Sequence, residues 1–344
     1  MQKACEEIDR NKITSPSPPA TLLILLTHVR DFCAFPGILD QVAAKGADGL
    51  LVLYFLSGYL VVHSWESRAS TADYWRKRAR RLFPLYYVML ALCLFVNRAF
   101  YVQYPRVVIC ALAMLNFVTP PPYAASWSMT LTGVLAIFWM IYCLIPLLSR
   151  LASTPARAFG LFWLSLIVYC SLPPFFSWLY RGVADPAASA GMAEYGFRFL
   201  PYACGGIMAR RLKEEKNMAL AALYGLIILG YNTLYPFMTD GGGIVLVALL
   251  TAILMVRIQL PGDRVWKLLR FVDSLSVGII LVQPYLLPWI KARLGFYPEW
   301  FQHISMIAAT YALACVLHWV VEWPGEKLID RMFKYLPQGK KENL

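Results

Sequence analysis

A histidine and an aspartate interrupt the first apolar stretch of the chain, where ionisable side chains are unusual. His28 follows the apolar run TLLILLT, and Asp31 lies three residues later. An imidazole with a pKa of about 6.5 can accept a proton at neutral pH, and a carboxylate one helical turn away can orient it. The pair suggests a general base. Two other interpretations stay open: His28 as a helix-packing residue, and Asp31 as the partner of Arg30.

Five cations within six residues form a second candidate site. They stand between two apolar runs that are long enough to cross a bilayer, and they are Arg76, Lys77, Arg78, Arg80 and Arg81. Guanidinium groups bind phosphates through paired hydrogen bonds, whereas cationic loops also hold a segment on the cytoplasmic side of a membrane. The cluster therefore predicts a phosphate-bearing ligand or a topology signal. Arg78 and Arg81, three residues apart, would share one face of a helix.

The composition indicates a protein that crosses the membrane several times. Of the 344 residues, 59% are hydrophobic and 15% are charged, whereas a soluble domain carries roughly 25% charged residues. Apolar runs recur along the chain between short polar loops, so we expect an all-α polytopic membrane bundle. The net charge of +12 lies largely in those loops. Positive-inside topology and anionic lipids explain such cations, and we expect no nucleic-acid partner.

The apolar pattern fits about ten full spans and one shorter segment. The predicted spans cover residues 20–35, 49–65, 82–98, 129–149, 158–178, 196–209, 217–236, 242–257, 273–291 and 304–322. The shorter segment, 107–119, ends at three prolines and is expected to be re-entrant or interfacial. The cation-rich loops then share one side, which predicts that both termini are cytoplasmic. We divide the chain into a tail (1–19), a membrane domain (20–336) and a second tail (337–344).

The cysteines and histidines show no pattern typical of a metal site or a disulfide framework. The eight cysteines include no C-x-x-C pair, and most fall inside apolar runs. They are typical of small buried side chains. The four histidines lack metal-ligand spacing. We therefore expect no metal.

Several short motifs follow one another along the chain. Leu-Ser-Gly-Tyr-Leu occupies 56–60, Arg-Ala-Arg-Arg-Leu-Phe-Pro occupies 78–84, and Val-Glu-Trp-Pro occupies 321–324. Further motifs lie at 126–146, 199–205 and 276–283. In this order they resemble acyltransferase family 3, a family of integral-membrane proteins with the patterns L-S-G-[FY]-L, R-x-x-R-[IL]-[YF]-P and V-E-x-P. Within the first motif, Ser57 and Gly58 are small residues at which two spans can approach closely.

This resemblance implies the transfer of an acyl group from acyl-CoA to a hydroxyl of a carbohydrate or lipid-linked glycan. The acyl group expected from the resemblance is acetyl. It also implies a place in the bacterial inner membrane. His28 would be the general base, and Arg78 and Arg81 would contact the donor phosphates from the cytoplasm. Asn116 or Trp127 would line the acceptor or oxyanion region. A thioester is already activated, so the reaction needs no metal.

The chain departs from the family pattern at two positions that matter for catalysis. No acid lies between Trp127 and Pro146, where the family has a glutamate, and Gln283 stands where histidine is usual. Asp31 would then orient the base in place of the missing acid, with Asp48 as another candidate for this role, and Gln283 remains a candidate for substrate binding. The departures leave two alternatives, a degenerate scaffold without activity and a transporter of the acyl donor or glycan. The oligomeric state stays open.

Overall fold

The computed structural model describes residues 17–96, 105–115, 127–179, 181, 197–234, 243–255 and 271–334. All regular elements in these ranges are helical, which confirms the predicted all-α class. Asn116 lies outside the described residues, as do residues 1–16 and 335–344 of the two predicted tails. Trp127 begins a helix, but its side chain is outside the description.

Four helical stretches in the described ranges are long and apolar enough to cross a bilayer. They are Gly49–Glu66, Gly133–Leu151, Pro155–Leu179 and Glu299–Lys334. Two shorter apolar helices cover Met218–Thr233 and Val245–Met255. These stretches support a membrane protein with several spans, and the part of the chain that the structure describes does not test whether all ten predicted spans are present.

Two of the predicted apolar segments form short helices. The first span was expected over residues 20–35, but helix α2 (Ser17–Arg30) has 14 residues. At 1.5 Å per residue it is about 21 Å long, less than the roughly 30 Å of a hydrocarbon core. Helix α7 (Pro105–Leu112) has 8 residues and measures about 12 Å. Its length agrees with the expectation that this segment does not cross the membrane.

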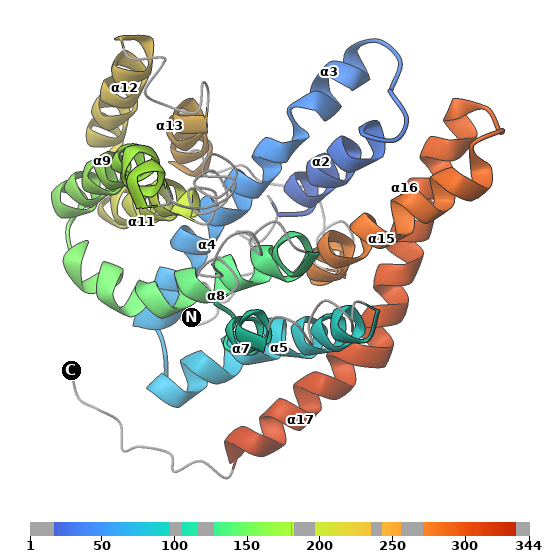
Figure 1. Cartoon of the computed structure of the whole chain (residues 1–344). Coiled ribbons are helices and arrows are strands. Elements are labelled where there is room, and N and C mark those ends of the chain that lie inside the picture. The colour runs from blue at the N-terminus through green and yellow to red at the C-terminus, as the bar shows by residue number, and fades with distance from the viewer. Residues whose placement is uncertain are drawn as a thin grey trace, which may run out of the picture. The chain divides into compact units, whose positions relative to one another are not determined.

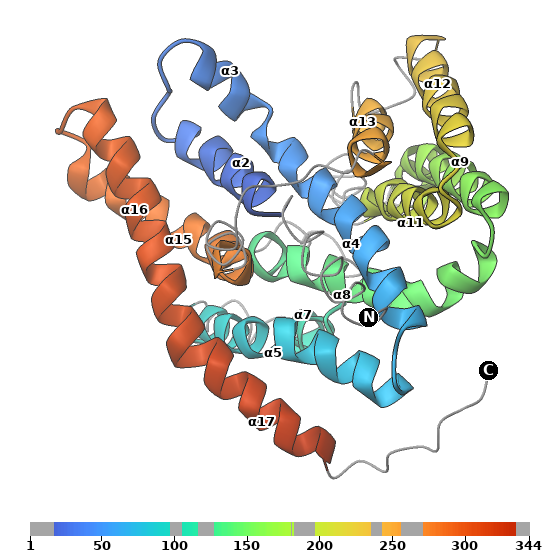
Figure 2. The same ribbon diagram turned by 180° about the vertical axis from the view of Figure 1, so that it is seen from behind.

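The described residues divide into two compact units, and the first joins the beginning of the chain to a late segment. It comprises Met1–Leu53 and Ile258–Trp323. Its helices are α2, α3 (Ile38–Ala44), η1 (Gly46–Asp48), α15 (Ser276–Leu294), α16 (Glu299–Leu317) and the π-helical turn η4 (His318–Glu322). Helix α15 packs against both α2 and α16 (Figures 1 and 2). Buried apolar residues join the three helices, among them Val29, Ile279 and Met306.

A close approach of two backbone segments brings α3 and η1 back onto α2. The Thr27 hydroxyl donates a hydrogen bond to the Ala43 carbonyl at 2.6 Å. Gly46 lies so near α2 that a Cβ at this position would be 2.0 Å from the Leu23 carbonyl oxygen. Only glycine fits there, and the turn holds the end of α2 that carries His28.

The second unit comprises Tyr54–Arg257 and Pro324–Leu344. Its helices are most of α4 (Gly49–Glu66), α5 (Thr71–Val96), α7, α8 (Trp127–Leu151), α9 (Pro155–Leu179), α11 (Phe199–Glu215), α12 (Met218–Leu234), α13 (Gly243–Met255) and nearly all of α17 (Trp323–Lys334). Helix α11 packs against α8, α9, α12 and α13. This explains why most of its first eleven residues are buried.

Helices α4 and α11 cross at two glycines, one from each helix. A Cβ on Gly58 would be 2.0 Å from the Ala203 carbonyl oxygen, and a Cβ on Gly206 would be 2.0 Å from the Phe55 carbonyl oxygen. Each glycine therefore receives the backbone of the opposite helix. The crossing unites the 56–60 motif with the 199–205 motif, and it positions the polar end of α4.

Candidate functional site

The structure places the predicted base and its neighbour together at the end of α2. His28 Nδ1 lies 3.5 Å from Asp31 Oδ2, and the two side chains are 48% and 56% exposed. This separation is at the long limit of a hydrogen bond. When Nδ1 faces the carboxylate, Nε2 is left to accept a proton from a substrate.

Arg30, the other partner considered for Asp31, is engaged elsewhere. Its Nε and Nη2 donate to the two carboxylate oxygens of Asp40 at 2.9 and 3.0 Å. The hydrogen bond from Arg30 lowers the pKa of the Asp40 carboxyl below its ordinary value. This paired contact ties α2 to α3 and leaves Asp31 facing the histidine.

Buried polar side chains also occur on α15 and α16 of this unit. His303 on α16 bonds through Nε2 to the Cys33 carbonyl at 3.0 Å and stacks on Phe35 with ring centroids 4.2 Å apart. Because a carbonyl only accepts, Nε2 of His303 carries the proton. Gln283 on α15 is 1% exposed, and its Oε1 has no hydrogen-bond partner among the described residues. An unsatisfied buried amide oxygen is costly, so Gln283 is a position at which a polar ligand would bind favourably.

A second histidine–carboxylate pair, which the sequence analysis did not single out, lies in the π-helical turn η4. His318 Nδ1 is 2.5 Å from Glu322 Oε2, and Glu322 is 7% exposed. Single π-helical turns occur often at functional sites. The signal was present in the sequence as a histidine four residues before the glutamate of the 321–324 motif.

The two pairs lie toward opposite ends of the first unit. His303, which contacts the segment following α2, and His318 are 15 residues apart along one continuous helix. At 1.5 Å per residue this is about 22 Å. The imidazoles of His28 and His318 therefore cannot both act on one reacting group in a single step, because a general base must be within hydrogen-bond reach of the proton that it accepts.

The cation cluster, in the second unit, lies on a helix. It was expected in a loop before a span, but helix α5 begins at Thr71 and includes both the cluster and Pro84. Asp73 in the first turn of α5 binds Arg76 at 2.8 Å and Lys77 at 2.7 Å. These pairs satisfy the cations on the helix itself, which removes the need for an extended loop.

Helix α17 neutralises another cation of the cluster. Arg80 contacts Glu326 at 2.7 Å and Asp330 at 3.3 Å. A Cβ on Gly325 would be 2.5 Å from the Pro84 ring, so the two helices also touch at a glycine and a proline. The 78–84 motif and the residues that follow the 321–324 motif therefore meet in space.

Arg78 differs from its neighbours because it has no carboxylate partner among the described residues. Its Nη2 donates to the Ser64 hydroxyl at 2.8 Å, and its guanidinium lies over the rings of Tyr74 and Tyr142 at 5.6 and 5.3 Å from their centroids. Arg81, on the same helix, is exposed. A guanidinium held by neutral groups keeps its full charge for an anionic ligand.

The end of α4 carries a further polar cluster next to Ser64. Arg210 donates to His63 Nδ1 at 2.9 Å and to Glu214 at 2.6 Å. Because a guanidinium only donates, His63 Nδ1 accepts and the ring is neutral. Arg78 and Arg210 thus contact consecutive residues of α4.

Comparison with known proteins assigns the chain to a family. A family model described as an acyltransferase domain matches residues 20–319. The chain belongs to acyltransferase family 3. The resemblance in the motifs is therefore confirmed. The match includes both histidine–carboxylate pairs except Glu322, and it includes the whole cation cluster.

One relative of the chain is the peptidoglycan O-acetyltransferase OatA of Listeria monocytogenes (strain EGD-e). The two sequences are 23% identical over 326 residues, which cover 83% of this chain and 52% of the relative. The chain thus spans about half the length of this relative. No solved structure matches the chain.

Among the described residues no group of three His, Cys, Asp or Glu side chains is arranged to hold a metal ion. The described cysteines are all free thiols. The polar groups with a chemical role to consider are therefore the histidine–carboxylate pairs, Gln283 and the arginines at the end of α4.

Proposed function

We propose that this protein is a membrane-embedded O-acyltransferase that moves an acetyl group from acetyl-CoA to a hydroxyl of a carbohydrate or lipid-linked glycan. The family match over residues 20–319 carries the proposal. The relative that acts as a peptidoglycan O-acetyltransferase supports a glycan acceptor. The orientation, with both termini cytoplasmic in a bacterial inner membrane, is part of the same proposal.

In the proposed reaction His28 accepts the proton of the acceptor hydroxyl at Nε2 while Asp31 orients the ring. The acceptor oxygen attacks the thioester carbonyl, a C–O bond forms and the C–S bond breaks. The thiolate leaves and takes up a proton, so the products are an ester and a free thiol. Asn116, Trp127 and Gln283 remain candidates for binding the acceptor or the oxyanion.

On the donor side we propose Arg78 as the main phosphate contact, with Arg81 beside it. Three other cations of the cluster are engaged by Asp73, Glu326 and Asp330. The neutral partners of Arg78 leave its charge uncompensated. This supports a phosphate ligand over a topology signal alone.

The proposal is tested with the purified protein, labelled acetyl-CoA and a series of glycan acceptors. We expect release of free thiol and transfer of label, both dependent on an acceptor hydroxyl. A folded protein that turns over no thioester with any glycan acceptor would instead support a non-catalytic scaffold, or a transporter if labelled donor or glycan crosses vesicles that contain it.

Replacing Arg78 and Arg81 with lysine tests the donor site. The double variant Arg78→Lys/Arg81→Lys keeps the topology charge but loses the planar pair of donors. Loss of one charge-assisted contact corresponds to roughly a tenfold rise in the KM for the donor. Steady-state kinetics at varied acetyl-CoA concentration measure it.

The matched control is Arg76→Lys/Arg80→Lys on the same helix, which exchanges two arginines that are already paired with acids. It should leave the donor KM nearly unchanged. Equal effects in both double variants, or none in either, would reduce the cluster to a topology signal.

A further inference from the structure

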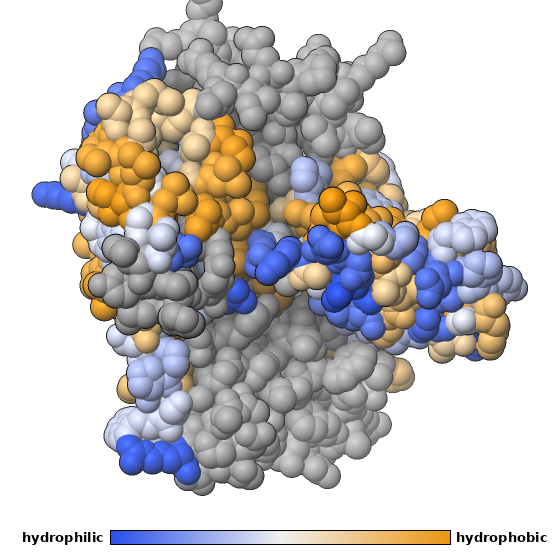
Figure 3. Space-filling view, turned by 90° about the horizontal axis from the view of Figure 1, so that it is seen from above, coloured by the Kyte–Doolittle hydropathy of each residue, from blue (hydrophilic) through white to orange (hydrophobic). Residues whose placement is uncertain are grey.

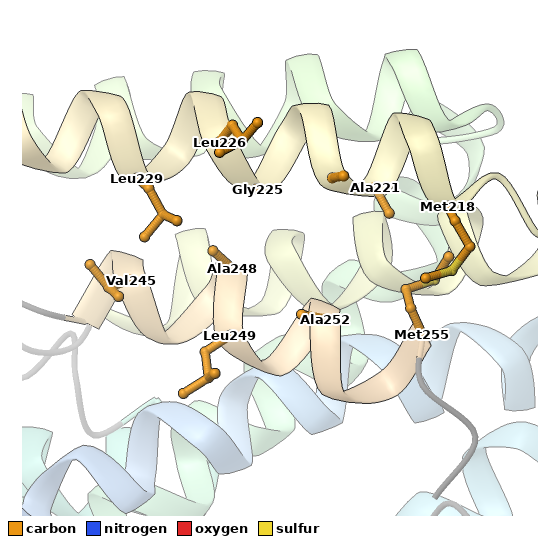
Figure 4. Close-up of a pocket in the computed structure, with 11 residues that line it drawn as sticks. Met218, Ala221, Gly225, Leu226, Leu229, Val245, Ala248, Leu249, Ala252 and Met255 are labelled. Atoms are coloured by element: carbon orange, nitrogen blue, oxygen red, sulfur yellow. The ribbon is translucent and has the colours of Figure 1, made fainter.

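An apolar groove lies between α12 and α13 of the second unit, and none of the polar groups described above lines it. Its volume is about 550 Å³. Figure 4 shows the lining side chains along the two helices, with Leu229, Val245 and Ala248 between them. The lining residues are Met218, Ala221, Ala222, Gly225, Leu226, Leu229, Val245, Ala248, Leu249, Ala252 and Met255.

The groove is open because α12 is held from its other side. Tyr224 stacks on Phe159 with ring centroids 3.9 Å apart, and Tyr231 meets Trp163 at 4.8 Å. These aromatic contacts fix α12 to α9. The face of α12 that turns to α13 carries small residues at helical spacing, which leave space between the helices.

The lining selects hydrocarbon as the ligand. None of the eleven side chains can donate a hydrogen bond, and the thioether sulfurs of Met218 and Met255 are only weak acceptors. A sugar or nucleotide placed there would therefore lose its bonds to water with little replacement. Large hydrophobic residues are exposed on the same helices, among them Leu223, Leu226 and Leu249. Figure 3 shows hydrophobic residues gathered on one part of the described surface, as expected of a surface that faces lipid.

The length of the groove fits one leaflet. From Val245 to Met255 the α13 side of the groove spans ten residue steps, or about 15 Å. That is half of the roughly 30 Å hydrocarbon core. A single acyl chain of a phospholipid therefore fits, whereas a much longer polyprenyl chain would project beyond the groove.

One end of the groove is cationic. Met218 and Met255 lie together at that end (Figure 4), and Met218 follows Lys216 by two residues. Residues 210–216 carry four cations against two acids. Glu214 is engaged by Arg210 and Arg211, while Lys216 is exposed. An anionic headgroup at this end would find a complementary charge.

We propose that this groove binds one acyl chain of an anionic phospholipid of the cytoplasmic leaflet, with its phosphate near Lys213 and Lys216. Bound there, the lipid fills the space between two helices that are otherwise short for the membrane. The site is distinct from the acyl-transfer groups and does not depend on the proposed reaction.

Native mass spectrometry of the full chain in detergent tests the proposal, with phosphatidylglycerol and phosphatidylcholine of identical chains as probes. We expect the wild type to retain one phosphatidylglycerol in preference to phosphatidylcholine. Ala222→Leu/Ala252→Leu should fill the groove and remove this lipid. Ala219→Leu is the control, because Ala219 is exposed on α12 outside the groove. Lys213→Gln/Lys216→Gln should weaken the preference by about fivefold for each lysine.

A second measurement does not depend on folded variants. Phosphatidylglycerol with a photoreactive acyl chain should label wild-type peptides that contain 218–229 and 245–255. The proposal is overturned if labelling is absent from these peptides, if Ala219→Leu loses the lipid as readily as the filled variant, if both headgroups bind equally, or if a polyprenyl-linked glycan is the lipid retained.

Discussion

Replacing His28 with alanine is expected to abolish acyl transfer while the protein still inserts and folds. General-base catalysis contributes typically about 10²–10⁴-fold, so the loss should fall in that range. His28 is half exposed at the end of α2 and takes no part in the buried core described for its unit. Its removal should therefore affect the rate with little change in stability. Acceptor-dependent release of thiol from acetyl-CoA measures the effect.

Two companion variants sharpen this test. Asp31→Asn should weaken transfer more than Gln283→Ala, because Asp31 Oδ2 lies 3.5 Å from the His28 imidazole. His318→Ala is the alternative, since His318 is also paired with a carboxylate. Full activity in His28→Ala together with loss in His318→Ala would transfer the general-base role to the His318–Glu322 pair.

Gly58→Ala should destabilise the folded protein by about 3 kcal/mol, the upper part of the range for overpacking in a core. The added Cβ would be 2.0 Å from the Ala203 carbonyl oxygen. Backbone cannot move aside as a flexible side chain would, so α4 and α11 must separate. The melting temperature of the purified protein in detergent should fall clearly.

Gly160→Ala is the matched control for this variant. Gly160 also lies within a helix of the second unit, α9, but a Cβ there would have nothing within 4 Å. Alanine is the better helix former by roughly 0.5–1 kcal/mol, so this variant should be as stable as the wild type or slightly more stable. If the Gly58→Ala protein has the same melting temperature as the Gly160→Ala protein, the crossing of α4 and α11 is looser than described.

Local patterns in the sequence were sufficient to predict several of the helices and the family. The span predicted at 49–65 is helix α4, Gly49–Glu66, and the span predicted at 158–178 lies within α9. Both have continuous apolar runs, and in lipid such runs must satisfy their backbone hydrogen bonds within a helix. Among the described residues the span predicted at 20–35 is the one that differs, because α2 ends at Arg30. Hydropathy does not show where a helix such as α2 ends at a tertiary turn.

The pairing of polar side chains could not be predicted from local patterns in the sequence. Arg80 finds Glu326 at a separation of 246 residues, and Arg78 finds Ser64 through the packing of α5 on α4. In the sequence these two arginines look alike. The positions of distant helices decide which of them meets a carboxylate and which keeps its charge for a ligand.

The sequence by itself determined that this is a helical membrane protein of acyltransferase family 3, with His28 and the cations of 76–81 as the groups to consider. Both properties reside in short-range patterns, the length of apolar runs and the order of motifs. The tertiary structure decided the close crossing at Gly58 and Gly206, the burial of Glu322 beside His318, and the groove between α12 and α13. Each of these features depends on which faces of the helices pack against one another, because side-chain volume and charge act only at contact distance.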